Sequence, residues 1–205
     1  MPLDSTEVQL LCQYGTAKLF PTKSILINEG DSSDNLYVIL DGRVRVYVSD
    51  AKGKDVTLCI QRAGEFFGEM AILDGLPRSA SVITLEPTNL CVISNSGFKR
   101  CLQENPHLPG KLLVSAVSRV RELTENVKNL ALLDVYGRVA ATLDRLAIDK
   151  DGERVIERLT HQSIASMVGA SREMVSKIIR SLLIGGYIKN NKGLIVLKRK
   201  LPHSW

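Results

Sequence analysis

The sequence predicts an α+β chain with an N-terminal antiparallel β-domain, one long helix, and a C-terminal helix pair followed by a β-hairpin. Three observations predict this order. Short apolar segments separated by turn glycines fill the first half. The stretch from 110 to 132 has helical apolar spacing, with no Gly or Pro after its first residue. A helix-turn-helix pattern then occupies 161–180. We expect the three parts at residues 1–108, 109–134 and 135–205.

The composition is that of a globular protein. Of 205 residues, 44% are hydrophobic and 24% are charged. No apolar run reaches the roughly 18 residues of a membrane span, and the N-terminus lacks the basic and apolar regions of a secretory signal. The four cysteines, at 12, 59, 91 and 101, are scattered. We therefore expect free thiols, a cytoplasmic location and no contact with a membrane.

The β-domain is predicted by a rhythm of glycines and strands from about residue 20 to 97. Glycines stand at 30, 42, 53, 64 and 75, and the expected strands between and after them are 36–40, 44–48, 56–60, 79–85 and 90–94. Short strands at such regular spacing are typical of a sandwich or barrel.

The long helix carries two apolar stripes. The first has spacings of 4, 3, 4, 3 and 4 and consists of Leu113, Val117, Val120, Thr124, Val127 and Ala131. This period favours a coiled-coil dimer seam. While this stripe faces a partner helix, the second stripe can lie on the β-domain; it consists of Leu112, Ala116, Leu123 and Leu130. The alternative is a single wide apolar face packed on its own domain. Thr124 is polar, and it either bonds back to its own helix or offers its hydroxyl to something at the interface.

The C-terminal part is basic and has a DNA-binding pattern. Residues 131–205 hold 13 Lys+Arg against 7 Asp+Glu, whereas residues 1–130 hold 14 against 15. After a helix at 135–148, with Asp134 as its N-cap, and a turn at 149–153, the small, turn and apolar positions of a helix-turn-helix are filled. These positions are Ala165, Gly169, Val175 and Ile178, with Thr160 or Ser163 and then Ser171 as caps.

The second helix of this pair is expected to present polar residues outward for DNA. They are Arg172, Glu173, Ser176, Lys177 and Arg180. Arginine and lysine donate to guanine or phosphate, and glutamate accepts from cytosine. Residues 187–189 and 194–198, joined by a turn at 190–193, would add a wing. A helical pair with a solvated face is the alternative.

The segment 64–82 has the residue types that an anionic ligand needs. Gly68 permits close backbone approach, Arg78 can bind a phosphodiester, Ser79 can add a donor, and Glu69 can accept a ribose hydroxyl proton. One arginine balances the single charge of a cyclic nucleotide. The alternative is a surface ion pair between Glu69 and Arg78.

Taken in order, GE…PRSA, NLALLDVYGR and GASREMVSKII resemble the cyclic-AMP receptor (Crp/Fnr) family of bacterial transcription regulators. The resemblance covers residues from about 18 to 197. It implies a cyclic-nucleotide-binding β-roll (jelly roll), a dimerisation helix and a winged helix-turn-helix. It also implies a homodimer that binds double-stranded DNA when cyclic AMP is bound, with Asp134 as the hinge.

The resemblance also implies residue roles. Gly68 and Glu69 would approach the ribose, and Arg78 and Ser79 would hold the phosphate. Thr124 matches a polar position that meets adenine across the dimer, while Leu123 stands where threonine is usual. For DNA, the matching positions are Arg172 and Glu173, which would read bases, and Lys177 and His161, which stand where arginine is more usual.

Other functions are disfavoured by what the sequence lacks. No nucleophile–base pattern, Walker loop or dinucleotide fingerprint indicates an enzyme. The spacing of the cysteines and of the three histidines does not predict an iron–sulfur cluster, haem or metal site. The open alternatives are another ligand, such as a cyclic dinucleotide or cyclic GMP, or no ligand. The resemblance also implies RNA polymerase as a partner, because the turn at 149–153 stands where activators of the family can contact it, and this favours an activator.

Overall fold

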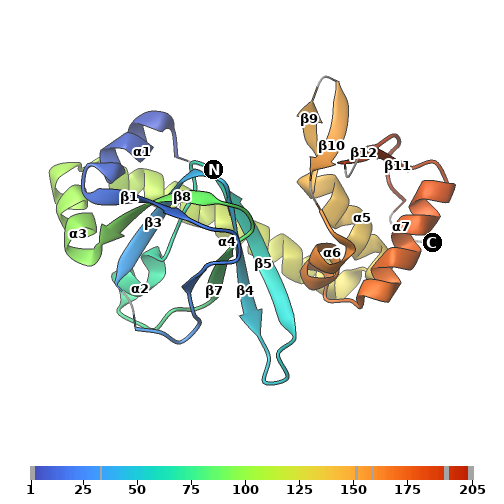
Figure 1. The fold of residues 1–205 in the computed structure, drawn as a ribbon, viewed down its shortest axis with the longest axis horizontal. Helices are drawn as coiled ribbons and strands as arrows, with labels where there is room; N and C mark the ends of the chain where they lie inside the picture. The colour runs from blue at the N-terminus through green and yellow to red at the C-terminus, as the bar shows by residue number, and fades with distance from the viewer. Residues whose placement is uncertain (1–2, 33, 151, 158, 192–193, 203–205) are drawn as a thin grey trace. The chain divides into compact units, whose positions relative to one another are not determined.

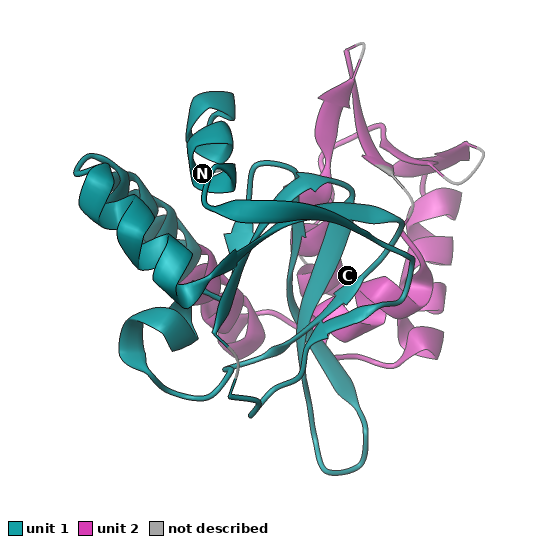
Figure 2. Ribbon diagram, turned by 60° about the vertical axis from the view of Figure 1, so that its left-hand side comes forward, with its two compact units in different colours: residues 1–121 teal, residues 122–205 magenta. Residues whose placement is uncertain are grey.

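The computed structural model describes residues 3–32, 34–150, 152–157, 159–191 and 194–202 (Figure 1). The chain forms two compact units, residues 1–121 and 122–205, shown in separate colours in Figure 2. The division falls within the long helix. The observed architecture is the α+β order that the sequence predicts.

The first unit contains two antiparallel four-stranded sheets. One has the order β1-β8-β3-β6, and the other has the order β2-β7-β4-β5. Their strands are β1 (Gly15–Phe20), β2 (Ile25–Ile27), β3 (Asn35–Asp41), β4 (Arg43–Ser49), β5 (Asp55–Arg62), β6 (Phe66–Phe67), β7 (Ser81–Thr84) and β8 (Thr88–Ser94). The sequence pattern predicts five of these segments and misses β1, β2 and β6, which have weaker strand signals.

Two apolar clusters hold this unit together. One joins residues of both sheets and includes the fully buried Ile39, Val44 and Leu90. The other lies with α1 (Ser5–Cys12), α3 (Asn95–Glu104) and the start of α4 (Leu108–Leu132), and includes Phe98 and Leu108. Helices therefore share a core with the first sheet, and the two sheets share a separate core.

The N-terminal region is more ordered than the sequence pattern indicates. Asp4 and Glu7 form a reciprocal capping box that starts α1. Such a box satisfies two backbone donors that a helix start would otherwise leave unpaired. Strand β1 then pairs with β8, with Gly15 opposite Ile93 and Phe20 opposite Thr88. The β-domain thus begins before residue 20, where the sequence pattern places its start.

The long helix α4 runs from Leu108 to Leu132 and exposes most of its apolar residues. Leu108 and Ser115 are buried, and Leu112 is half-buried against the helix-side core. The expectation that the whole second stripe lies on the β-domain is wrong, because Ala116, Leu123 and Leu130 are exposed. The buried apolar contacts of α4 with the first unit are made by its N-terminal part.

The second unit packs three helices against a small sheet. The helices are α5 (Val135–Leu146), α6 (His161–Val168) and α7 (Arg172–Ile184). The sheet has the order β11-β12-β10-β9, with β9 (Ile148–Lys150), β10 (Glu153–Glu157), β11 (Ile188–Asn191) and β12 (Leu194–Leu197). The sequence pattern misses β9 and β10, and these strands include Asp149, Lys150 and Glu153 of the turn expected at 149–153. Asp151 of that turn, and Lys192 and Gly193 of the expected wing turn, lie outside the described residues.

Candidate ligand and DNA-binding sites

Gly68 and Arg78 form the centre of the candidate ligand site. Gly68 is the N-cap of α2 (Glu69–Asp74) and has φ of 87°, a left-handed conformation that favours glycine. A Cβ built on Gly68 would lie 2.7 Å from Arg78 Nη1 and 2.7 Å from the Asn35 carbonyl oxygen. The glycine is therefore needed both for its backbone angle and for the close approach of the guanidinium.

Arg78 is a buried cation with backbone partners. The residue is only 4% exposed, and its two terminal nitrogens donate to Gly68 O at 2.6 Å and Asn35 O at 2.7 Å. Burial lowers the pKa of Arg78, while nearby negative charges, including those of Asp34 and Glu69, act in the opposite direction. Guanidinium stays protonated at physiological pH. A desolvated positive charge beside neutral carbonyls attracts an anion.

Glu69 has a partner that the sequence analysis missed. Arg119 on α4 makes an ion pair with Glu69 at 2.6 Å, donates to Phe66 O, and lies over the Phe66 ring at 4.6 Å. Glu69 is thus paired with an arginine other than Arg78. An arginine in an amphipathic helix gives no sequence signal for this role, because its partner is 50 positions away.

Ser79 is exposed and close to the same loop. Its hydroxyl donates to Met70 Sδ at 3.6 Å, a weak interaction. The segment around it is fixed by backbone hydrogen bonds, from Arg78 N to Asp31 O at 2.9 Å and from Gly30 N to Arg78 O at 2.8 Å. The structure thus brings Gly68, Arg78 and Ser79 together in one unit.

The remaining candidate ligand residues lie on the part of α4 that belongs to the second unit. Leu123 is 47% exposed, and Thr124 is also exposed. The candidate seam residues are exposed in the same way, with fractions of 65% for Leu113, 47% for Val117, 61% for Val120 and 65% for Val127. A continuous apolar stripe on one helix is thus accessible to a partner.

Asp134 forms the start of α5, as the sequence predicts. Its side chain accepts a hydrogen bond from Gly137 N at 2.7 Å. Nearby, Arg138 donates to Leu133 O at 3.1 Å and to Val168 O at 2.9 Å, the last carbonyl of α6. The Arg138 side chain therefore joins the segment that follows α4 to the first helix of the helix-turn-helix.

The helix-turn-helix has the geometry that its pattern predicts. Thr160 caps α6 and Ser171 caps α7, and Gly169 ends α6 with φ of 65°. The positions expected to lock the pair are buried, with exposures of 1% for Ala165, 0% for Val175 and 7% for Ile178. These contacts fix the orientation of α7 relative to α6 within the unit.

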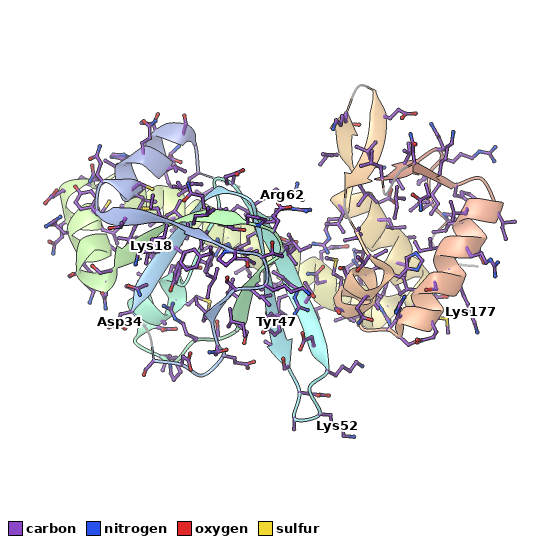
Figure 3. The ribbon with its side chains drawn as sticks, in the orientation of Figure 1. Lys18, Asp34, Tyr47, Lys52, Arg62 and Lys177 are labelled. Carbon is purple, nitrogen blue, oxygen red and sulfur yellow. The ribbon has the colours of Figure 1, made fainter. Side chains whose placement is uncertain are left out.

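The outer face of α7 presents charged residues. Arg172, Glu173 and Lys177 are exposed, and Figure 3 shows Lys177 on this helix. Ser176 differs from the expectation, because it is half-buried and its hydroxyl donates to Arg172 O at 2.8 Å. The same hydroxyl lies 2.9 Å from His161 Nδ1. Ser176 therefore connects α7 with α6 rather than facing outward.

Comparisons with known proteins identify both parts. Residues 17–105 match the family model of the cyclic nucleotide-binding domain, and residues 137–201 match that of the Crp-like helix-turn-helix domain. The chain is 36% identical over 170 residues to the cAMP-activated global transcriptional regulator CRP of Pasteurella multocida strain Pm70, covering 80% of each protein.

The chain belongs to the Crp/Fnr family.

Two solved structures are similar to this chain in fold. A CRP/FNR family regulator from Thermus thermophilus is 28% identical, with a TM-score of 0.73 over 90% of this chain and 94% of that one. The global regulator CLP of Xanthomonas campestris has the same fold, with a TM-score of 0.80 at 24% identity over 95% of this chain and 99% of that one. The chain is thus a cyclic-nucleotide-binding, DNA-binding transcription regulator of the Crp/Fnr type, and its relatives are regulators rather than enzymes.

Two further features of the described residues bear on the site. No helix among them is long and apolar enough to cross a membrane. The same residues contain no group of three or more His, Cys, Asp or Glu placed to hold a metal ion.

Proposed function

We propose that this Crp/Fnr regulator is controlled by cyclic AMP, bound at the site formed by Gly68, Glu69, Arg78 and Ser79. The buried guanidinium of Arg78 is the observation that carries the proposal. Two neutral carbonyl oxygens accept hydrogen bonds from it, at 2.6 and 2.7 Å. A cyclic phosphate has one negative charge, which one arginine can neutralise.

Glu69 and Arg119 suit the sugar side of such a ligand. Glu69 is an acceptor for a ribose hydroxyl, and its ion pair with Arg119 at 2.6 Å holds the carboxylate in a fixed place. Because Arg119 belongs to α4, this pair connects the ligand site with the long helix. A ligand that binds Glu69 would therefore change the contacts of Arg119 and the position of α4, and through α4 the position of the segment at Asp134.

We further propose that the chain acts as a homodimer through the exposed α4 stripe, defined by Leu113, Val117, Val120 and Val127. Thr124 and Leu123 would lie at that interface beside the nucleotide base. Two copies of α7 would then meet successive major grooves of a palindromic site, with half-sites about one DNA turn apart. Arg172, Glu173 and Lys177 would read bases, and Ser171 and His161 would contact phosphates.

Two further roles belong to the same proposal. The paired strands β9 and β10 include Asp149 and Glu153 of the acidic segment 149–153, and this segment would contact RNA polymerase, which favours an activator. Because the partner is DNA, the place of action would be the bacterial cytoplasm.

A cyclic dinucleotide is the second candidate ligand. CLP of Xanthomonas campestris is a c-di-GMP responsive regulator. Leu123 has no polar group that could hydrogen-bond to an adenine, so this position does not select adenine over another base. Two phosphate charges would, however, face a single Arg78 in this loop, so we favour a nucleotide with one phosphate. Cyclic GMP and regulation without ligand are the remaining alternatives.

Isothermal titration of the full chain with cyclic AMP, cyclic GMP and c-di-GMP tests the proposal. We expect cyclic AMP to bind most tightly. The substitution Arg78→Ala should weaken binding at least about tenfold, because a charge-assisted hydrogen bond contributes about 1.5–3 kcal/mol. Arg62→Ala, an exposed arginine of β5 labelled in Figure 3, is the matched control and should bind as the parent does.

Two results would contradict the proposal. Tighter binding of c-di-GMP than of cyclic AMP would show that cyclic AMP is not the ligand. An Arg78→Ala variant that binds cyclic AMP with the parental affinity would show that the ligand does not bind at Arg78.

A further inference from the structure

Gln61, near the end of β5, has a buried side-chain amide whose oxygen has no hydrogen-bond partner among the described residues. The residue is 4% exposed, and its Nε2 donates to the Phe66 carbonyl oxygen at 3.3 Å. Within the described part of the chain, its Oε1 has no hydrogen-bond partner. The orientation of the amide follows from chemistry, because a carbonyl oxygen only accepts and so must face the nitrogen. What remains is a buried acceptor.

An acceptor without a donor is costly in a protein interior, and most buried polar atoms are therefore paired. Thr57, four residues earlier on the same strand, shows that burial alone does not mark a site. Thr57 Oγ1 is also buried and unpaired among the described residues, and no contact described for them joins it to Arg119 or Glu69. What distinguishes Gln61 is its place in the hydrogen-bond network of the candidate site.

The network joins Gln61 to the ligand residues through one atom. The Phe66 carbonyl oxygen accepts from Gln61 Nε2 and also from Arg119 Nη2. Arg119 also makes an ion pair with Glu69. Glu69 directly follows Gly68, and the Gly68 carbonyl oxygen accepts a hydrogen bond from Arg78. The contacts thus lead from Arg78, the proposed phosphate ligand, to Glu69, the proposed ribose ligand, and then through Arg119 and Phe66 to Gln61. In a cyclic nucleotide the ribose likewise lies between phosphate and base.

We propose that Gln61 determines base specificity by accepting a hydrogen bond from the exocyclic amino group of adenine. This inference rests on the proposed binding of cyclic AMP. Adenine has an amino group at the six position of its ring, and guanine and hypoxanthine have an oxygen there. An oxygen would face Gln61 Oε1 as a second acceptor and leave both unpaired. A purine without a substituent would leave only Oε1 unpaired.

Three cyclic nucleotides that differ at the six position test this inference. The full chain is titrated calorimetrically with cyclic AMP, the cyclic monophosphate of unsubstituted purine riboside, and cyclic inosine monophosphate. We expect the parent to bind cyclic AMP about three- to tenfold more tightly than the purine compound, as one neutral hydrogen bond would give. The inosine compound should bind more weakly still.

Variants then assign the preference to one residue. In Gln61→Leu the three affinities should fall within about twofold of each other, because the acceptor is gone. Thr57→Val is the matched control, since it removes a second buried side-chain oxygen of β5 that has no partner among the described residues, and it should keep the parental ratios. A merely structural role of Gln61 would change all three affinities equally and would not change their ratios.

The outcomes separate this inference from the proposed function. If the parent binds cyclic AMP without discriminating against the purine compound, Gln61 does not read the base, and this result does not depend on the folding of any variant. If Gln61→Leu folds and keeps the parental ratios, the inference is wrong as well. If the parent does not bind cyclic AMP at all, the proposed function fails and this inference fails with it.

Discussion

Replacing Gly68 by alanine tests the geometry of the ligand site directly. At φ of 87° the left-handed conformation costs an alanine about 1–2 kcal/mol. Its Cβ would also lie 2.7 Å from Arg78 Nη1 and 2.7 Å from the Asn35 backbone oxygen. The arginine tip can move away, but the backbone oxygen cannot move without shifting β3. Overpacking of this kind adds about 1–3 kcal/mol.

Gly75→Ala is the matched control at the other end of α2. Gly75 has φ of 71°, so it carries a similar conformational cost, but a Cβ there would meet nothing within 4 Å. We expect Gly68→Ala to lower the free energy of unfolding by about 2–5 kcal/mol and Gly75→Ala by about 1–2 kcal/mol. Urea denaturation followed by circular dichroism measures both. Titration with cyclic AMP should show a loss of at least about tenfold for Gly68→Ala alone, because Arg78 is displaced.

Equal stability of the two variants, together with equal affinity for the nucleotide, would refute this reasoning. Equal stability would mean that the close approach of Gly68 and Arg78 does not constrain the loop. Unchanged affinity in a destabilised Gly68→Ala variant would mean that Arg78 does not hold the ligand.

Further predictions concern the helix, the hinge and the DNA face. Val120→Glu should give a monomer in sedimentation and lose specific DNA binding, whereas Ser118→Glu on the same helix should stay dimeric; a dimer of Val120→Glu would contradict the seam. Asp134→Ala should destabilise the second unit by about 1 kcal/mol through loss of the α5 cap, measured by thermal unfolding, and an unchanged transition would argue against it. Glu173→Ala should relax selection at one base pair, at about 1–3 kcal/mol of discrimination, in selection from random duplexes; an unchanged consensus would remove its reading role. Lys189→Ala should weaken binding to all sequences and reduce the salt dependence, which titration at several salt concentrations measures.

Elements whose cause is local can be predicted from the amino-acid sequence. The positions of the helix-turn-helix depend on Ala165, Gly169 and a few apolar residues within one short segment, and the cap at Asp134 depends on a residue three positions away. The sequence also predicts Gly68 and Arg78 as phosphate-binding residues, because a glycine allows close backbone approach and an arginine can bind a phosphate. The structure brings the two residues together, and their role toward a ligand stays a prediction. Such patterns are read from neighbouring residues alone.

Contacts between residues far apart in the chain are seen only in the folded structure. It paired Glu69 with Arg119, 50 positions on, and placed Gln61 beside the same Phe66 carbonyl. It also turned Ser176 toward His161 and left Leu123 and Leu130 exposed. A helical period shows that residues share a face, but it does not show which neighbour covers that face. Which donor meets which acceptor depends on how strands and helices pack, and that packing is set by the whole chain.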